Sequence, residues 1–440
     1  MKRLSIILLL FSIASNNYVY AQEKHQKRLT DLQIVSLIDS LKKSLIRYYI
    51  FPDKALSMGK HLSSQLKKGA YKGINDQAKL AYKLESDIKE INYDSHLHVN
   101  FEPGLLAPKK LSSDERAMAM KEQLATEIEN NFNLQKAEIL PGNIGYFLFN
   151  GFTGNINEAK PILNGALTFL SGTRALIIDL RNNGGGNSNN RLESYFFKER
   201  THLIDNVNTF NKDTLSIYAD PKTTNGLTLL MPIYILTSKN TFSAAEAFSA
   251  SMQSLKRAII VGDTTGGGSH LTGTFDLKNG FVAKIPFARP VSTSTFKDWE
   301  GVGVVPDIPV KASRALQMAQ EVIYKKFLLK AKSDKDKRKI QWAINALIAE
   351  QNPLNMNSNS YSKYAGSYSG GIQFYVENNQ LLCRNPERGG TDVFKLTPVS
   401  NDIFLLDENV QIEFLRDEND IYASLKMLWK DGNVSQRSKE

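Results

Sequence analysis

The feature of this sequence that most constrains its fold is a series of short apolar runs separated by segments of helical periodicity. The runs that we expect to form strands lie at residues 143–150, 174–180, 231–237 and 258–262. Helical patterns occupy 157–171 and 244–255, between these runs. Strands and helices that alternate at this spacing predict an α/β core with parallel strand pairing. The centre of the second run, Ala175-Leu176-Ile177-Ile178, is continuously apolar, as in strands that are buried on both faces.

Segments of a different character lie on both sides of this core. Apolar residues recur at helical spacing from residue 31 to about residue 90, which predicts a small helical cap. After the core, helices are expected at 313–330 and 337–350, and a polar stretch at 355–360 is the best candidate for a linker. Short apolar runs separated by turn residues follow this linker and predict an antiparallel β module.

The first 21 residues have the pattern of a secretory signal peptide. Lys2 and Arg3 precede an apolar stretch that runs to Ala14, and Ala21 provides a small residue for cleavage. The stretch is shorter than the ~20 residues of a membrane-spanning helix, although an uncleaved N-terminal anchor is the alternative. We therefore expect an exported protein, periplasmic or secreted after cleavage near Ala21.

These patterns together predict how the chain is divided into domains. The expected segments are a signal peptide at 1–21, an N-terminal helical cap domain at 22–108, the α/β core at 109–312, a helical connection at 313–353 and an antiparallel β accessory domain at 361–440.

The charge and the cysteine content limit the classes of function. The 440 residues carry a formal net charge of +10, but no basic stripe is interleaved with aromatic residues, so we expect no nucleic-acid partner. Cys383 is the single cysteine, which excludes a disulfide framework within the chain and a cysteine-rich zinc module. The sequence gives no sign of a cofactor and no indication of the oligomeric state.

A candidate nucleophile lies after the third apolar run. A short turn leads from that run to Ser243, where a helix is expected to begin. The free N–H groups at a helix N-terminus stabilise developing negative charge, which suits a reactive serine. However, Ser243 and Glu246 also have the spacing of a capping box, and most serines in such boxes only cap the helix. This segment alone leaves both interpretations open.

Two other runs end in glycine-rich turns. Residues 182–186 follow the second run and could present backbone N–H groups to an anion. They lack both the G-x-G-x-x-G pattern and the G-K-[ST] ending of nucleotide sites, so an oxyanion hole fits better, with a plain flexible turn as the alternative. The second turn, 262–270, follows the fourth run and ends at His270.

Two histidines lie where the cap ends. In an extended strand His96 and His98 would share a face and could ligate a metal. No third ligand with a recognisable spacing accompanies them, so we predict no metal site, and a structural role is the common alternative for either residue. Further along, Glu300 heads a strand-like segment that is broken by Gly301 and Gly303.

The order and spacing of these segments resemble the tail-specific (C-terminal processing) protease family, which also includes tricorn protease and the interphotoreceptor retinoid-binding protein. The family motif D-x-R-x-N-x-G-G is matched by Asp179, Arg181, Asn183, Gly185 and Gly186. Residues 241–246 match the serine segment, 262–267 match the glycine loop with a one-residue shift, and 300–307 match E-G-x-G-x-x-P-D. The resemblance covers roughly residues 30–310 and implies a crotonase/ClpP-like α/β core.

Two branches of that family activate their serine differently. In the processing-protease branch the base is a lysine of the glycine loop, at a position that Gly268 occupies here. In the tricorn-like branch the base is a histidine preceded by serine, with a glutamate far downstream, and Ser95, His96 and Glu300 match this pattern. Too few residues separate the cap from the first core strand for a PDZ domain. The chain therefore resembles the PDZ-less, tricorn-like branch.

The resemblance implies a role for each matched residue. Ser243 would be the nucleophile, His96 the general base, and Glu300 with Ser95 an orienting relay. The oxyanion hole would consist of backbone N–H groups, contributed by Ala244 and by Gly184 or Gly185. His98 and His270 stay open as alternative bases.

The function implied is that of an exported serine peptidase. It would hydrolyse peptide bonds of unfolded or short peptides through an acyl-enzyme at Ser243, without a metal or cofactor. Two alternatives stay open: a catalytically inactive family member that binds peptides or lipids, and a serine esterase on the same core. The C-terminal module resembles the small β accessory domains of secreted hydrolases.

Overall fold

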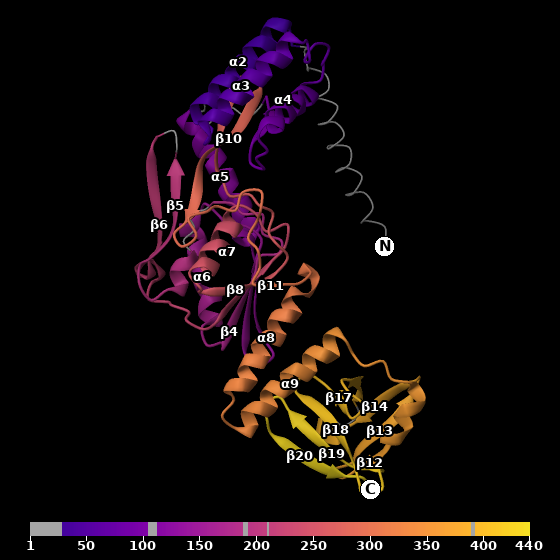
Figure 1. The fold of residues 1–440 in the computed structure, drawn as a ribbon. Coiled ribbons are helices and arrows are strands. Elements are labelled where there is room, and N and C mark those ends of the chain that lie inside the picture. Colours follow the sequence, from indigo (N-terminus) through magenta and orange to yellow (C-terminus); the bar gives the residue numbers. More distant parts are fainter. Residues whose placement is uncertain (1–28, 104–111, 188–191, 209–210, 389–391) are drawn as a thin grey trace.

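The computed structural model describes residues 29–103, 112–187, 192–208, 211–388 and 392–440. The expected signal peptide at 1–21 lies outside this part of the chain. Figure 1 shows a helical cap at one end, an α/β core in the middle and a β module at the other end. None of the helices in the described ranges combines the length and the apolar character needed to cross a membrane. The expected fold class is confirmed, while the domain boundaries stay a prediction.

The cap consists of three helices that pack on strands from a distant part of the sequence. The helices are α2 (Asp31–Tyr48), α3 (Pro52–Lys67) and α4 (Gln77–Ile91), and the strands are β1 (His98–Phe101), β9 (Leu271–Lys278) and β10 (Phe281–Ser292). β10 pairs antiparallel with both β1 and β9. Leu37 and Leu41 of α2 share a buried core with Ala283 and Ile285 of β10. Strands β9 and β10 were not expected from the sequence.

The core sheet has the order β11-β8-β7-β4-β3-β2. Its strands are β2 (Leu134–Leu140), β3 (Ile144–Phe149), β4 (Ala175–Asp179), β7 (Ile233–Thr237), β8 (Ala258–Gly262) and β11 (Ile308–Pro309). All neighbours pair in parallel except β2 and β3, so the predicted parallel core is confirmed. Strands β4, β7 and β8 therefore end at one edge, where the serine and glycine turns meet.

Helices cover both faces of this sheet. Leu176 and Ile178 of β4 pack with α6 (Ile156–Leu170) and α7 (Ala244–Ser254). Ala175 and Ile177 face the other way and pack with α8 (Ala315–Lys330) and α9 (Asp334–Gln351). This arrangement explains why the run is apolar at every position.

The remaining elements extend this framework. Helix α5 (Ser113–Glu129) follows the cap, and β5 (Thr201–Asn208) pairs with β6 (Asp213–Ala219) and with the end of β10. Short 3-10 helices lie at Asn131–Asn133, Leu192–Phe196, Pro221–Thr224, Ala312–Arg314, Ser358–Tyr364 and Pro386–Arg388. Because β10 pairs with β1 near its start and with β5 near its end, one strand joins the cap to the core.

The C-terminal module is antiparallel, as predicted, and its described residues form two sheets. Their strands are β12 (Gly366–Tyr368), β13 (Ile372–Glu377), β14 (Gln380–Arg384), β15 (Val393–Lys395), β16 (Thr397–Pro398), β17 (Ile403–Leu405), β18 (Val410–Arg416), β19 (Tyr422–Trp429) and β20 (Val434–Ser438). Asn345 of α9 donates to Gln411 of β18 at 2.8 Å, and both side chains are buried. Helix α9 thus connects this module to the core.

Leu176→Ala tests the central packing. The side chain is fully buried, so the substitution should lower the free energy of unfolding by about 2–5 kcal/mol through lost apolar contact and the cavity left behind. Denaturant unfolding measures the change. Leu329→Ala on α8, where the leucine is 87% exposed, is the matched control and should shift stability by less than about 0.5 kcal/mol. Equal losses in the two variants would contradict this description of the core.

Candidate active site

The backbone at Ser243 is strained and held by the neighbouring turn. Ser243 has φ +54°, a conformation that residues other than glycine rarely adopt. The turn before it is tied to the turn after β4: Thr241 donates to the Leu180 carbonyl at 2.8 Å, and the Phe242 N–H donates to the Asn183 carbonyl at 3.1 Å. These bonds fix the place where α7 begins.

The D-x-R-x-N-x-G-G motif shapes the turn after β4. Arg181 binds the buried carboxylate of Asp179 through Nε and Nη2, at 3.0 and 2.6 Å. Asn183 donates to the Phe149 carbonyl at 3.0 Å and accepts the Gly185 N–H at 2.9 Å. Gly185 has φ +98°, and a Cβ there would lie 2.8 Å from the Ser243 Cβ. Glycine is therefore required where this turn meets the serine.

Glu246 joins the start of α7 to the glycine loop at 262–270. Its buried carboxylate accepts the Ser243 N–H at 2.9 Å, the Thr265 hydroxyl at 2.5 Å, and the N–H groups of Gly267 and Gly268 at 2.7 and 2.8 Å. Burial raises the pKa of Glu246, although these hydrogen bonds favour its ionised form. Glu246 therefore does more than cap the helix: its side chain also holds the glycine loop that faces Ser243.

His96 reaches the site from the cap. It lies in a turn before β1, so the expectation that His96 and His98 share a face of one strand is wrong. The His96 N–H donates to Asp94 at 3.0 Å, and its ring stacks on Phe242 with centroids 4.8 Å apart. A Cβ at Gly268 would lie 2.6 Å from His96 Cε1. The ring therefore lies next to Gly268, where the resemblance would place a lysine in the processing-protease branch.

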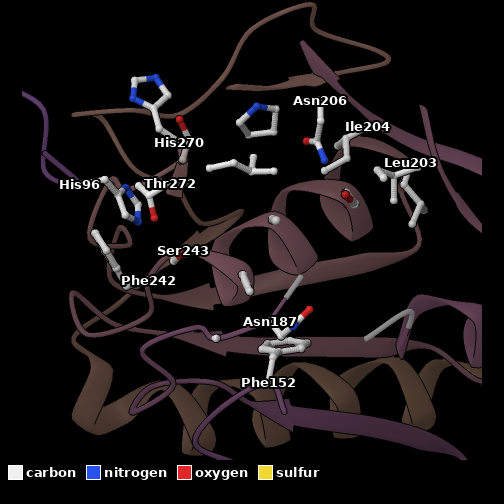
Figure 2. Close-up of a pocket in the computed structure, with 18 of the residues that line it drawn as sticks. His96, Phe152, Asn187, Leu203, Ile204, Asn206, Phe242, Ser243, His270 and Thr272 are labelled. Atoms are coloured by element: carbon white, nitrogen blue, oxygen red, sulfur yellow. The ribbon is translucent and has the colours of Figure 1, made fainter. Parts of the chain in front are cut away.

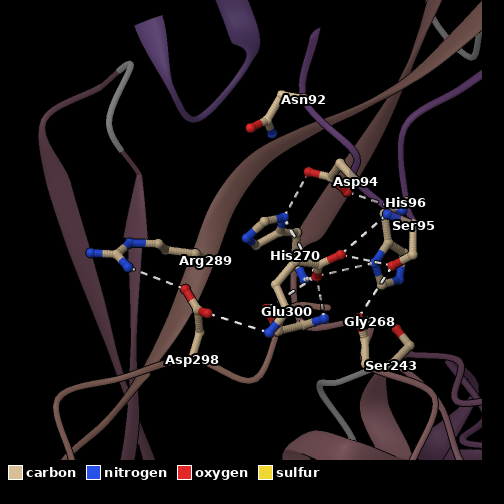
Figure 3. Close-up of polar contacts among 12 residues, drawn as sticks. Asn92, Asp94, Ser95, His96, Ser243, Gly268, His270, Arg289, Asp298 and Glu300 are labelled. Atoms are coloured by element: carbon tan, nitrogen blue, oxygen red, sulfur yellow. Dashed lines mark hydrogen bonds and ion pairs between the residues drawn. The ribbon is translucent and has the colours of Figure 1, made fainter. Parts of the chain in front are cut away.

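Glu300 lies behind the His96 ring. Its Oε2 is 3.9 Å from His96 Nδ1, an atom that is buried and has no hydrogen-bond partner among the described residues. Oε1 accepts the Ser95 hydroxyl at 2.7 Å, and Oε2 accepts the N–H groups of Ser269 and His270 at 2.6 and 3.2 Å (Figure 3). Burial alone would raise the pKa of Glu300, but His96, the charge of His270, and Ser95 lower it to about 2. The carboxylate is therefore ionised at neutral pH.

One cavity of about 460 Å³ is lined by both His96 and Ser243. Figure 2 shows His96, Phe242 and Ser243 at one end and the β5 residues Leu203 and Ile204 at the other. Gly184 and Ala244 line the cavity as well. The cavity thus combines a polar end, where the candidate catalytic residues meet, with an apolar end.

The other predicted site residues are placed differently. His98 lies on β1, hydrogen-bonds Glu85 at 3.2 Å, is not among the lining residues and is 39% exposed. His270 lines the cavity, and its Nδ1 lies 2.8 Å from Asp94. Asp94 was not predicted as a site residue, although it lies two residues before His96 and could have been noticed for that reason. The structure thus brings His96 and His270 to the site, but not His98.

Two clusters have the composition of metal ligands. In the described residues, the candidate ligand atoms of Asp94, His96 and Glu300 lie within 4.8 Å of one another, as do those of a second cluster, His61 with Asp87 and Glu90. Three of their carboxylates already accept hydrogen bonds: Glu300 accepts those given above, Asp94 accepts the backbone N–H of His96, and Asp87 accepts Tyr71 at 2.8 Å and Lys83. We therefore assign no metal site to either cluster.

Comparisons with known proteins match two parts of the chain. Residues 143–310 match peptidase family S41, and residues 29–135 match the N-terminal domain of Peptidase_S41 in eukaryotic IRBP. His96 lies in the second match and Ser243 in the first, so the cavity lies where the two matched parts meet. The resemblance inferred from the motifs is thereby confirmed.

Individual relatives match the chain over different lengths. The carboxyl-terminal-processing peptidase 2 of Arabidopsis thaliana chloroplasts is 28% identical over 183 residues, which are 40% of this chain and 34% of that protein. The carboxyl-terminal-processing protease of Picosynechococcus is 27% identical over 168 residues, which are 37% of this chain and 38% of that protein. The chain thus spans less than two fifths of either relative. The photosystem II D1 C-terminal processing protease structure has a TM-score of 0.40, at 16% identity over 63% of this chain and 92% of that one.

The pH dependence of stability tests the Glu300 interactions. A carboxyl group whose pKa falls from 4.5 to about 2 on folding stabilises the protein above pH 4.5, and this stabilisation is lost as the pH falls toward 2. Glu300→Gln should therefore be less stable by on the order of 2 kcal/mol at pH 6 and by much less at pH 3, after allowance for solvent screening. Urea unfolding at both pH values measures this difference. A difference that does not change with pH would contradict the prediction.

Proposed function

The chain carries both matched domains of peptidase family S41, and on this premise we propose that it is a serine peptidase with Ser243 as nucleophile and His96 as general base. The observation that best supports this is the shared cavity, which both side chains line, with an ionised Glu300 behind the histidine ring. A serine hydroxyl is a weak nucleophile until a base removes its proton, and this arrangement supplies the base.

The reaction begins when Ser243 Oγ attacks a peptide carbonyl carbon while His96 accepts the hydroxyl proton. Nδ1 of His96 lies toward Glu300, so we assign the proton transfer to Nε2, on the other side of the ring. The carboxylate of Glu300 stabilises the imidazolium that forms. Ser95 donates to Glu300 and holds that carboxylate in position.

The oxyanion of the tetrahedral intermediate requires backbone donors. Ala244 is the first residue of α7, so its N–H has no partner within the helix. Gly184 lines the cavity beside it, whereas the N–H of Gly185 already donates to Asn183. We therefore assign the oxyanion hole to Gly184 and Ala244. Each such donor typically contributes about a hundredfold or more to the rate.

Collapse of the intermediate completes the acylation. The C–N bond breaks, the leaving amine takes the proton from His96, and the carbonyl group stays on Ser243 as an ester. Water then attacks this ester while His96 again accepts a proton. The second collapse releases the carboxylic acid and returns the proton to Ser243.

The substrate that we infer is an unfolded or short peptide. A cavity of about 460 Å³ is typical of sites that enclose small ligands, so it admits a segment of extended chain rather than a folded domain. Leu203 and Ile204 at the apolar end favour an apolar substrate side chain at some distance from the scissile bond, because Ser243 lies at the other end of the cavity (Figure 2). We further infer that the protein is exported, on the signal-peptide pattern of its first 21 residues; N-terminal sequencing of the protein from fractionated cells tests this.

Ser243→Ala should abolish turnover of unfolded proteins and covalent labelling by a fluorophosphonate probe. The substitution removes the attacking oxygen while changing the free energy of unfolding by only about 1 kcal/mol. Peptide mapping of the labelled wild-type protein and denaturant unfolding of the variant measure both effects. Wild-type protein without labelling would favour the inactive binder, and labelling with ester turnover but no peptide cleavage would favour the esterase.

The two neighbouring histidines provide a matched pair of variants. His96→Ala should slow fluorophosphonate labelling by about a hundredfold or more, because it removes the base. His98→Ala should label at nearly the wild-type rate, because His98 bonds Glu85 outside the cavity. Labelling rates at pH 7.5 measure the comparison. A slow His98→Ala variant beside a fast His96→Ala variant would overturn the assignment of the base.

A further inference from the structure

A second histidine, His270, lies next to the proposed catalytic residues but has no part in the reaction above. Its ring is buried, and Nδ1 lies 2.8 Å from Oδ2 of Asp94, which is fully buried (Figure 3). Nε2 is also buried and has no hydrogen-bond partner in the described part of the chain. Since Nε2 is unsatisfied in either protonation state, the surrounding charges decide whether the ring is protonated.

Glu300 couples His270 to the proposed base. Its Oε2 lies 3.5 Å from Nδ1 of His270 and 3.9 Å from Nδ1 of His96. Because the two imidazoles lie beside the same carboxylate oxygen, a positive charge on one ring opposes a positive charge on the other. The ring with the stronger anionic partners holds the proton.

The surroundings favour a proton on His270. It has a carboxylate hydrogen-bond partner in Asp94, whereas Nδ1 of His96 has no hydrogen-bond partner within the described residues and lies 3.9 Å from Glu300. Burial alone would lower the pKa of His270, but the hydrogen bond and charge of Asp94, followed by the charges of Glu300 and Asp298, raise it.

We propose that Asp94 and His270 form a buried ion pair whose positive member keeps His96 in its neutral, proton-accepting form. This inference rests on the proposed function, since it concerns the base of that reaction. His270 is a positioning residue that acts through His96. Without its charge, the carboxylates of Asp94 and Glu300 would stabilise an imidazolium at His96, and an imidazolium cannot accept the serine proton.

The other titratable groups near the pair come from three parts of the chain. Tyr49, which follows α2, donates to Asp94 at 3.1 Å, and burial raises its pKa, so it is a neutral donor. Asp298, two residues before Glu300, pairs with Arg289 of β10 at 3.1 Å. Lys284 of β10 lines the same cavity. The charged groups in direct contact with the His270 ring are thus the carboxylates of Asp94 and Glu300.

Histidine NMR of the intact protein tests the proposal directly. The chain has six histidines, so ring signals of ¹⁵N-labelled protein can be assigned one by one from single substitutions. At pH 7 we expect His270 to be protonated on both nitrogens and His96 to be neutral. A neutral His270 at pH 7 would overturn the proposal. This measurement needs no activity, so it stands even if the chain proves not to be a peptidase.

The pH dependence of fluorophosphonate labelling tests the effect on the base. His270→Asn keeps a donor toward Asp94 but removes the charge, so the acidic limb of the rate profile should move up by roughly one pH unit. The rate at high pH should stay near that of the wild type. Asp94→Asn should move the limb less, because the loss of its charge lets His270 become neutral as well. A structural defect would lower the rate at every pH without moving the midpoint.

His202→Asn is the matched control, because His202 also pairs with a carboxylate, Asp205, at 2.8 Å, but on β5. Its profile should coincide with that of the wild type. An unmoved midpoint in folded His270→Asn, or an equal shift in His202→Asn, would overturn the proposal. If His270→Asn fails to fold by circular dichroism, the NMR titration decides. If the wild-type protein does not label at all, the proposed function fails, and the NMR result still decides the ion pair.

Discussion

The carboxylate of Glu300 accepts hydrogen bonds from Ser95 of the cap and from Ser269 and His270 of the glycine loop. A buried carboxylate requires such donors, because burial without them costs several kcal/mol or neutralises the group. The need to satisfy one anion therefore holds together segments that are far apart in the sequence. His96 lies between two of these segments, so the position of its ring depends on the same set of bonds.

Glu246 has the corresponding role on the serine side. It binds the Ser243 N–H and two N–H groups of the glycine loop, so the strained serine backbone and the loop are fixed by one side chain. The loop in turn approaches the His96 ring at Gly268, where a side chain would collide with Cε1. The His96 ring can therefore occupy its place only because residue 268 is a glycine, and a lysine there would leave no room for the ring.

Local patterns in the sequence were sufficient to predict the parallel core. The run at 175–178 is apolar throughout because helices cover both faces of its sheet. Motif order was sufficient to bring Ser243, His96 and Glu300 together as candidates, and all three lie at or beside one cavity. Strands β9 and β10 pair as a hairpin across Asn279-Gly280, a local turn signal that was overlooked, and Gly273 interrupts the alternation of β9. The pairing of β10 with β1 joins segments more than 150 residues apart, and no local pattern predicts it. The Asp94–His270 contact spans 176 residues, and no local pattern encodes it.

Strand β10, which crosses from the cap to the core, also limits the order in which the parts of the chain can fold during synthesis. Residues 281–285 of β10 supply part of the hydrophobic interior of the cap, although α2, α3 and α4 are synthesised long before them. A nascent chain that ends before this strand has an unfinished N-terminal domain and lacks Glu300. The earliest part of the polypeptide is therefore among the last to reach its final packing, and contacts of such long sequence separation slow folding. The proposed catalytic residues consequently come together only once synthesis has passed residue 300.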